Sequence, residues 1–234
     1  MLQNGHKHGL KLEVVKLPEG SLHSSSQVSE IVGPLRVKPV QTRAIQTVEH
    51  ILRTAALLLA DVGVDQFNTN LLAERADVRV RTVYRYFVDK HAVILCLAER
   101  MYQRADESFT RTLRVLADPR VEWRLAIDGA IEDYFLTMGA NPEWVAIRRA
   151  VQSVPGLDSL RARSVARHAE WLADALCARG LSLPKSQVRI IAAVTFAGAS
   201  GAIEPAVRAN PRQRKVVVRE LKSMVHAYLS GYLD

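Results

Sequence analysis

Apolar residues recur at three- and four-residue spacing through most of the chain after Gln41, and this periodicity constrains the fold most strongly. Residues spaced in this way form one apolar face of a helix, whereas a half-buried strand would alternate residue by residue. No alternating run of useful length interrupts the pattern. Together with the low aromatic content of 6%, the pattern predicts an all-α fold.

Glycine, proline and capping residues divide this periodic region into separate helices. The first expected helix starts near Gln41, ends at Gly63 and carries on its apolar face Ile45, Val48, Leu52, Ala55, Ala56 and Leu59. Two short helices follow, and Asp89 is expected to cap a long helix that ends at Asp118-Pro119. The later helices are expected over about 121–139, 142–153, 158–179, 184–209 and 212–232.

The first forty residues differ from the rest, because they are polar and rich in turn-forming residues. We therefore expect three parts: a flexible N-terminal extension over 1–40, a helix-turn-helix domain over 41–88 and a helical domain over 89–234.

Charge and cysteine usage limit the classes of function. The net charge of +8 favours a polyanionic partner. Cys96 and Cys177 lie inside apolar helical patterns without metal-ligand spacing, which is typical of buried thiols in a reducing compartment. No apolar run approaches the ~20 residues of a membrane span. The sequence predicts a cytoplasmic protein that does not contact a membrane.

The segment from Asn68 to Lys90 has the pattern of a helix-turn-helix, in which the second helix enters the DNA major groove. Short helices need tertiary support, and the residues expected to supply it are Leu72, Ala73, Ala76, Val78, Val83 and Phe87. Packing does not require the remaining residues, which are Arg79, Val80, Arg81, Thr82, Arg85 and Tyr86. Since arginine binds guanine edges and phosphates, the segment predicts DNA binding.

This segment resembles the N-terminal domain of the TetR family of transcriptional regulators over about residues 43–95. The matching residues are Leu72-Ala73-Glu74-Arg75-Ala76, Val78, Thr82-Val83-Tyr84, Tyr86-Phe87 and Lys90. By position, the resemblance implies base-edge contacts from Val80, Arg81, Thr82 and Tyr86, and backbone contacts from Thr82, Tyr84 and Lys90. Arg43, with Arg36 and Lys38 upstream, is a further candidate for backbone or minor-groove contacts.

Three positions depart from the family pattern. Asp77 stands where most relatives carry glycine, and Arg79 and Arg81 stand where they carry small residues. Aspartate tolerates a left-handed conformation, so we expect the turn itself to persist. The two arginines change which bases or phosphates are contacted.

The resemblance also implies an apolar cavity for an inducer in the C-terminal domain. The candidate lining residues are Met101, Tyr134, Met138, Trp144 and Trp171. Apolar walls would favour a hydrophobic or aromatic small molecule. The same residues would also serve as ordinary core, which any helical bundle requires.

The last two helices are expected to form a homodimer interface. The first of them is rich in small residues, namely Ala192, Ala193, Ala197, Gly198, Ala199, Gly201 and Ala202. The second carries an apolar stripe of Val217, Leu221, Val225, Leu229 and Tyr232. Two copies would build a four-helix contact. The alternative is that these residues cover the rest of their own domain.

The favoured function is a ligand-responsive repressor that binds a palindromic operator on double-stranded DNA as a dimer and is released by a small apolar or aromatic effector. An architectural or weakly specific DNA-binding protein without an effector is the alternative. An enzyme is not expected, because the bundle has no Glu-x-x-His pair, no Ser-His-Asp cluster and no phosphate-binding glycine loop. The sequence therefore predicts no catalytic residues, no metal site and no cofactor.

Overall fold

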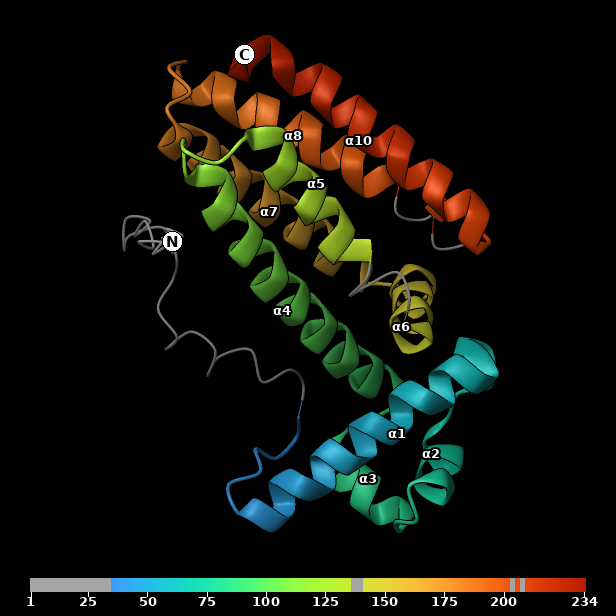
Figure 1. The fold of residues 1–234 in the computed structure, drawn as a ribbon. Coiled ribbons are helices and arrows are strands. Elements are labelled where there is room, and N and C mark those ends of the chain that lie inside the picture. The colour runs from blue at the N-terminus through green and yellow to red at the C-terminus, as the bar shows by residue number, and fades with distance from the viewer. Residues whose placement is uncertain (1–34, 136–140, 203–204, 207–208) are drawn as a thin grey trace, which may run out of the picture.

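The computed structural model describes residues 35–135, 141–202, 205–206 and 209–234, and these ranges are almost entirely α-helical (Figure 1). The helices are α1 (Thr42–Gln66), α2 (Thr69–Arg75), α3 (Val80–Tyr86), α4 (Lys90–Ala117), α5 (Trp123–Tyr134), α6 (Pro142–Ser153), α7 (Asp158–Arg179), α8 (Lys185–Gly201) and α10 (Pro211–Leu233). Within these ranges, β-type pairing is limited to a bridge between Leu35 and Phe87. The expected all-α fold is confirmed.

The helices form two packed regions joined by α4. We call α1, α2 and α3 the head, and α5, α7, α8 and α10 the C-terminal bundle; they occupy opposite ends of the molecule (Figure 1). The first half of α4 contributes Val93, Ile94 and Leu97 to the core around the head, and its second half contributes Leu113 and Leu116 to the core of the bundle. The long helix therefore belongs to both regions.

The helix α6 also packs against the head. Its side chains Trp144, Ile147 and Ala150 are buried in the same core as α1 and the first half of α4. In Figure 1, α6 lies between α1 and the rest of the C-terminal region. Two elements, α4 and α6, thus connect the head to the remainder of the chain.

The core of the head is made from the residues that the periodicity indicated. Phe67, Leu72, Val83 and Phe87 have no exposed surface. The expectation for Ile45 is wrong, since this residue is 43% exposed and the continuous burial of α1 begins only at Val48. Burial of large side chains contributes about 1.5–3 kcal/mol each, which stabilises helices as short as α2 and α3.

The helix boundaries follow local chemistry. Gly63 interrupts α1 with a φ of +73°, which glycine adopts without strain. The Asn68 side chain accepts a hydrogen bond of 2.9 Å from the Leu71 amide, and the Asp89 side chain accepts one of 2.8 Å from the Ala92 amide. The helix expected over 184–209 ends earlier, at Gly201, and residues 136–139 of the one expected over 121–139 lie outside the described ranges.

The turn between α4 and α5 is held by arginine side chains. The Arg179 guanidinium on α7 donates hydrogen bonds to the carbonyl oxygens of Leu116, Asp118 and Val121, at 2.9, 3.0 and 2.6 Å. These carbonyls lie at or beyond the end of α4 and have no helical partner there. Hydrogen bonds from Arg120 lower the pKa of the Asp118 carboxyl to about 2. Together these contacts fix the direction in which the bundle leaves α4.

Candidate nucleic-acid interface and cavity

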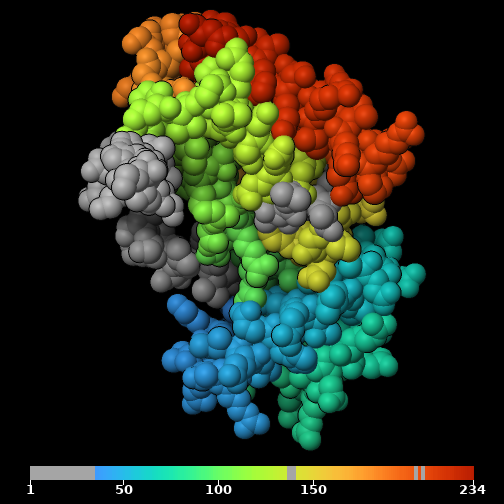
Figure 2. Space-filling model, viewed as in Figure 1, coloured from blue at the N-terminus to red at the C-terminus, as the bar shows by residue number. Residues whose placement is uncertain are grey.

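The helix α3 lies at the end of the head, opposite α8 and α10, where residues 69–90 form one tip of the molecular surface (Figures 1 and 2). Its solvent-facing residues, with the one that precedes it, are Arg79, Val80, Arg81, Tyr84 and Arg85. Thr82 is half-buried. The helix and the residue before it therefore present three arginines and an aromatic ring outward, while Val83 packs inward.

The turn before α3 determines how this surface is presented. Asp77 has a φ of +50°, the left-handed conformation expected for this position. The Val78 amide donates a 3.0 Å hydrogen bond to the Ala73 carbonyl, which closes the turn onto α2. The expectation that aspartate preserves the turn is confirmed.

The arginines on α3 and just before it are not engaged in ion pairs within the part of the chain that the structure describes. None of the ion pairs found among the described residues includes Arg79, Arg81 or Arg85. Two more of the predicted contact residues flank this surface: Arg43 is exposed in the first turn of α1, and Lys90 is half-buried at the start of α4. Exposed arginines whose charge is not engaged in an ion pair form a surface suited to phosphates and base edges.

Tyr84 is held in place from one side. Its hydroxyl lies 2.9 Å from the hydroxyl of Thr69 at the start of α2, and the residue as a whole is 41% exposed. This hydrogen bond joins α2 to α3 and limits the rotation of the ring. The predicted role of Tyr84 in contacting a DNA backbone is compatible with this position.

Tyr86 does not fit its predicted role at base edges. Only 3% of the residue is exposed, and its side chain belongs to the core that contains Phe87 and Val83. The Arg85 guanidinium lies 5.6 Å from the centre of the Tyr86 ring. Tyr86 is therefore part of the scaffold, and its spacing of three from Val83 on the same helix face is the signal that indicates this burial.

The segment just before α1 is attached to the end of α3. The Arg36 amide donates a 2.9 Å hydrogen bond to the Tyr86 carbonyl, beside the bridge between Leu35 and Phe87. The Arg36 guanidinium also donates to the Tyr84 carbonyl at 3.5 Å. The sequence placed these residues in a flexible extension, because a single bridge leaves no periodic signal.

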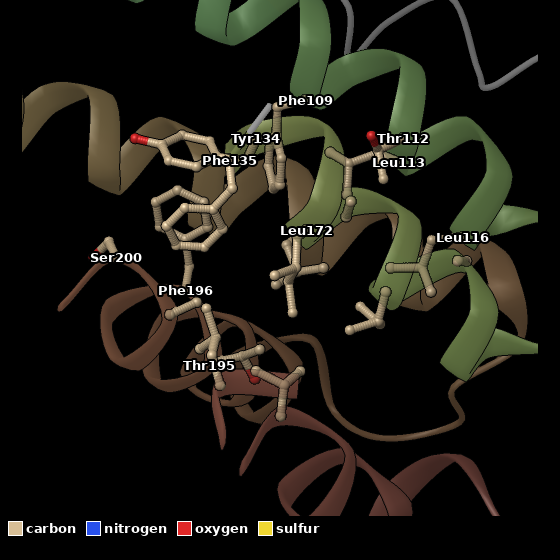
Figure 3. Close-up of a pocket in the computed structure, with 17 residues that line it drawn as sticks. Phe109, Thr112, Leu113, Leu116, Tyr134, Phe135, Leu172, Thr195, Phe196 and Ser200 are labelled. Carbon is tan, nitrogen blue, oxygen red and sulfur yellow. The ribbon is translucent and has the colours of Figure 1, made fainter. Parts of the chain in front are cut away.

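The C-terminal bundle contains a cavity of about 100 Å3 with an apolar wall. Phe135 and Phe196 lie toward one end and Leu113 and Leu116 toward the other (Figure 3). The hydroxyl group of Tyr134 points away from this group of side chains. The helices that supply the wall are α4, α5, α7, α8 and α10.

The predicted cavity residues are only partly brought together. Tyr134 lines the apolar cavity, and Met101 lines an adjoining one together with Tyr134. Trp144 is instead buried in the core beside α1, and Trp171 packs on the ring of His168 with centroids 5.5 Å apart, so these two assignments are wrong for both cavities. Met138 lies outside the described residues.

Phe109, Leu172 and Phe196 also line the apolar cavity, although the sequence does not predict them there. They lie on apolar helix faces, and periodicity does not distinguish a face that packs fully from one that borders a void.

The structure corrects the apolar stripe predicted for the dimer interface. Leu221, Val225 and Leu229 are at most 5% exposed and belong to the core of their own bundle. The large apolar residues that are at least 45% exposed on α8 and α10 are instead Ile190, Val194, Val216 and Met224. The two helices lie side by side at the edge of the molecule (Figure 1), and a side chain at Gly198 would meet Met224 at 3.3 Å. The two helices therefore expose a shared apolar face.

In the described part of the chain, no cluster of histidine, cysteine and carboxylate side chains has the arrangement of a metal site. Within the same ranges, no helix combines the length and apolarity needed to cross a membrane.

Both regions of the chain match known protein families. Residues 51–96 match the family described as bacterial regulatory proteins, tetR family, and residues 122–229 match the tetracyclin repressor-like C-terminal domain. The first match covers the turn at Asp77 and all of α3. The second covers the five helices from α5 to α8 and α10, apart from the last residues of the chain.

Individual relatives agree with these matches. The HTH-type transcriptional regulator EthR of Mycolicibacterium smegmatis is 34% identical over 93 residues, which are 39% of this chain and 41% of EthR. The tetracycline repressor protein class C of Escherichia coli is 43% identical over 53 residues, 23% of this chain and 24% of that protein. The matches thus span less than half the length of these curated relatives. A TetR-family transcriptional regulator from Streptomyces coelicolor has a similar structure, with a TM-score of 0.63 and 28% identity over 82% of this chain and 100% of that one.

Proposed function

We propose that this chain, which belongs to the TetR family of DNA-binding transcriptional regulators, is a repressor. It binds a palindromic operator as a dimer, and a small apolar effector releases it from the DNA. In this proposal residues 41–88 bind DNA, and residues 89–234 bind the effector and form the dimer. The observation that carries the proposal is the row of exposed arginines on α3 without acidic partners among the described residues.

The proposed DNA contacts come from α3 and its two flanks. Val80, Arg81 and Thr82 lie in the first turn of α3, which enters the major groove first in a helix-turn-helix. Arg79 and Arg85 supply further contacts to phosphates or guanine edges. Tyr84, Lys90 and Arg43 bind the DNA backbone on either side. Tyr86 supports α3 from the core and is not among the contacts.

The proposed dimer forms through the exposed apolar face of α8 and α10. Ile190 and Val194 on α8, with Val216 and Met224 on α10, are the large side chains that a second copy would cover. Exposed Ala193, Ala197 and Gly198 beside them allow close approach of the two copies. A two-fold axis here would place two copies of α3 on the same side of the dimer, as a palindromic operator requires.

The proposed effector site is the apolar cavity, and its wall explains how binding could reach the head. Leu113 and Leu116 of α4 border the cavity, while Val93 and Leu97 of the same helix are buried in the core around α1. A ligand that fits a different position of α4 better would shift the population away from the spacing that suits the operator.

The experiment that tests the DNA contacts is fluorescence anisotropy at fixed salt with duplexes selected from genomic DNA by binding. Replacing Arg81 with alanine should lower operator affinity by about 1–3 kcal/mol and relax the sequence preference. The control is Arg114→Ala, since this exposed arginine lies near the far end of α4 and has the same charge. The control should bind as the unaltered protein does.

Unchanged affinity and unchanged sequence preference in Arg81→Ala would contradict the proposed role of α3. Equal binding of the unaltered protein to unrelated duplexes, with affinity governed by salt alone, would instead support an architectural DNA-binding protein.

A further inference from the structure

A second cavity of about 90 Å3 adjoins the apolar one, and Tyr134, Phe196 and Ser200 line both. Unlike its neighbour, it has several polar side chains in a wall that is otherwise apolar, and these are Tyr102, Arg148, Gln152, Arg161, Ser164 and His168. The Tyr134 hydroxyl, which points away from the apolar side chains in Figure 3, is 3.0 Å from the Arg148 guanidinium on α6. The two cavities therefore lie next to each other, one apolar and the other with polar groups in its wall, and they share three lining residues.

The second cavity has an excess of positive charge. Arg148 and Arg161 line it, and no aspartate or glutamate does. Among the described residues, neither arginine takes part in an ion pair, and the contact of Arg148 with Tyr134 is to a neutral hydroxyl. The nearby Asp106 is already engaged, because its carboxylate binds His168 at 2.7 Å and Arg167 at 2.6 Å.

The two tyrosines in this wall add neutral hydrogen-bond donors. Burial raises the pKa of both Tyr102 and Tyr134, and the positive charges of Arg148 and Arg161 act in the opposite direction. Both hydroxyl groups thus keep their protons at neutral pH and can donate to an anion. An anionic group in this cavity would meet two guanidinium groups and two phenol donors.

We propose that the polar cavity binds the head of an amphipathic carboxylate whose apolar part occupies the adjoining cavity, with Arg148 and Arg161 as the carboxylate-binding pair. Guanidinium groups bind carboxylates through short, charge-assisted hydrogen bonds, and a partly enclosed site strengthens them. The inference rests on the proposed function, and it narrows the effector from any apolar molecule to an organic acid.

Arg148 connects the bound carboxylate to the head, because it lies on α6 and α6 packs against α1. On the same helix, Trp144, Ile147 and Ala150 are buried in the core that contains α1. A carboxylate that replaces the Tyr134 hydroxyl as the partner of Arg148 acts on α6, and α6 packs on the head. A neutral ligand in the apolar cavity lacks this contact.

The test compares three probes of equal chain length on the full chain: octanoate, 1-octanol and octylammonium. Isothermal titration calorimetry measures their affinities, and anisotropy with a selected operator duplex measures release of DNA. Octanoate should bind at least about tenfold more tightly than 1-octanol, and octylammonium should bind most weakly. Octanoate should also release the duplex at the lowest concentration.

Two variants test whether these arginines bind the carboxylate. Arg148→Gln and Arg161→Gln should each lower octanoate affinity about tenfold and leave 1-octanol affinity unchanged. Arg163→Gln is the matched control, because this arginine is exposed as Arg161 is, stands two residues further along α7 and lines neither cavity. It should bind all three probes as the unaltered protein does.

Equal affinity of the unaltered protein for octanoate and 1-octanol, or binding of none of the three probes, would overturn the inference without any variant having to fold. Failure of the proposed function gives a different result. If octanoate binds with the expected preference but the protein binds no duplex, or does not release it, the carboxylate site stands and the regulatory role fails.

Discussion

In the core of the head, Phe67, Leu72 and Phe87 are completely buried, whereas the core of the C-terminal bundle surrounds a cavity of about 100 Å3. Both cores are built from apolar faces of helices, so the difference does not lie in composition. A void of this size costs about 2 kcal/mol, because the side chains around it lose dispersion contacts.

The difference in packing suits the different functions proposed for the two regions. A surface that reads base edges must hold Arg81 and its neighbours in one geometry, and a filled core provides that rigidity. A region that admits a ligand must leave room for it. The bundle therefore gives up part of its packing energy at this cavity.

The largest expected effect is the loss of a large side chain from the head. Phe87→Ala should lower the free energy of unfolding by about 3–5 kcal/mol, since Phe87 is 0% exposed and packs where α3 ends. Denaturation in urea, monitored by circular dichroism, measures this change. A decrease below about 1 kcal/mol would show that the head is packed more loosely than its burial indicates.

The most direct comparison of the two cores makes the same substitution in each. Ala73→Leu in the head should destabilise the protein by about 1–3 kcal/mol, because Ala73 is 1% exposed and packs in the core that contains Leu72 and Val83. Ala130→Leu should change stability by less than about 1 kcal/mol, because Ala130 borders the cavity.

Both of these substitutions keep a strong helix former in a helix, so propensity contributes little to the difference. Urea denaturation of the two variants, side by side, measures it. Equal destabilisation by the two leucines would remove the contrast between a filled head and a hollow bundle.

The smallest expected effect is on stability at acid pH, and it involves the turn that joins α4 to the bundle. The pKa of Asp118 is lowered from 3.8 to about 2 by hydrogen bonds from Arg120, so its ionised form stabilises the folded state. That contribution is complete above about pH 4 and is lost as the pH falls toward 2. Asp118→Asn should therefore flatten the decrease of melting temperature between pH 4 and pH 2.

The control for this measurement is Asp174→Asn, which removes an exposed carboxylate from α7. A pH dependence that is the same in Asp118→Asn and the unaltered protein would exclude a role of this turn in acid stability.

The elements of the head could be predicted from the sequence because they depend on local chemistry. Asn68 and Asp89 cap the helices that follow them, and Gly63 and Asp77 adopt left-handed conformations that their residue types tolerate. Each of these effects acts over a few residues. The spacing of apolar residues then decides which helix face turns inward.

The predictions that the structure corrects have a different origin, because they depend on contacts between helices. Tyr86 was assigned to the DNA surface by family position, although Val83 three residues earlier lies on the buried face. Leu221 and Val225 form a regular apolar stripe, but a stripe does not state whether its partner is the same chain or a second copy. Trp144 was assigned to a cavity because aromatic residues suit one, and the structure places it against α1.

By itself the sequence determined the helices, the turn before α3, and the family, because caps, left-handed residues and apolar spacing act through neighbours along the chain. Only the tertiary structure decided which apolar faces enclose space and which charges meet there. Arg148 and Arg161 lie on different helices, and their approach to Tyr134 depends on how α5, α6 and α7 pack. Such a site is a property of distances between helices, and no pattern within one helix encodes them.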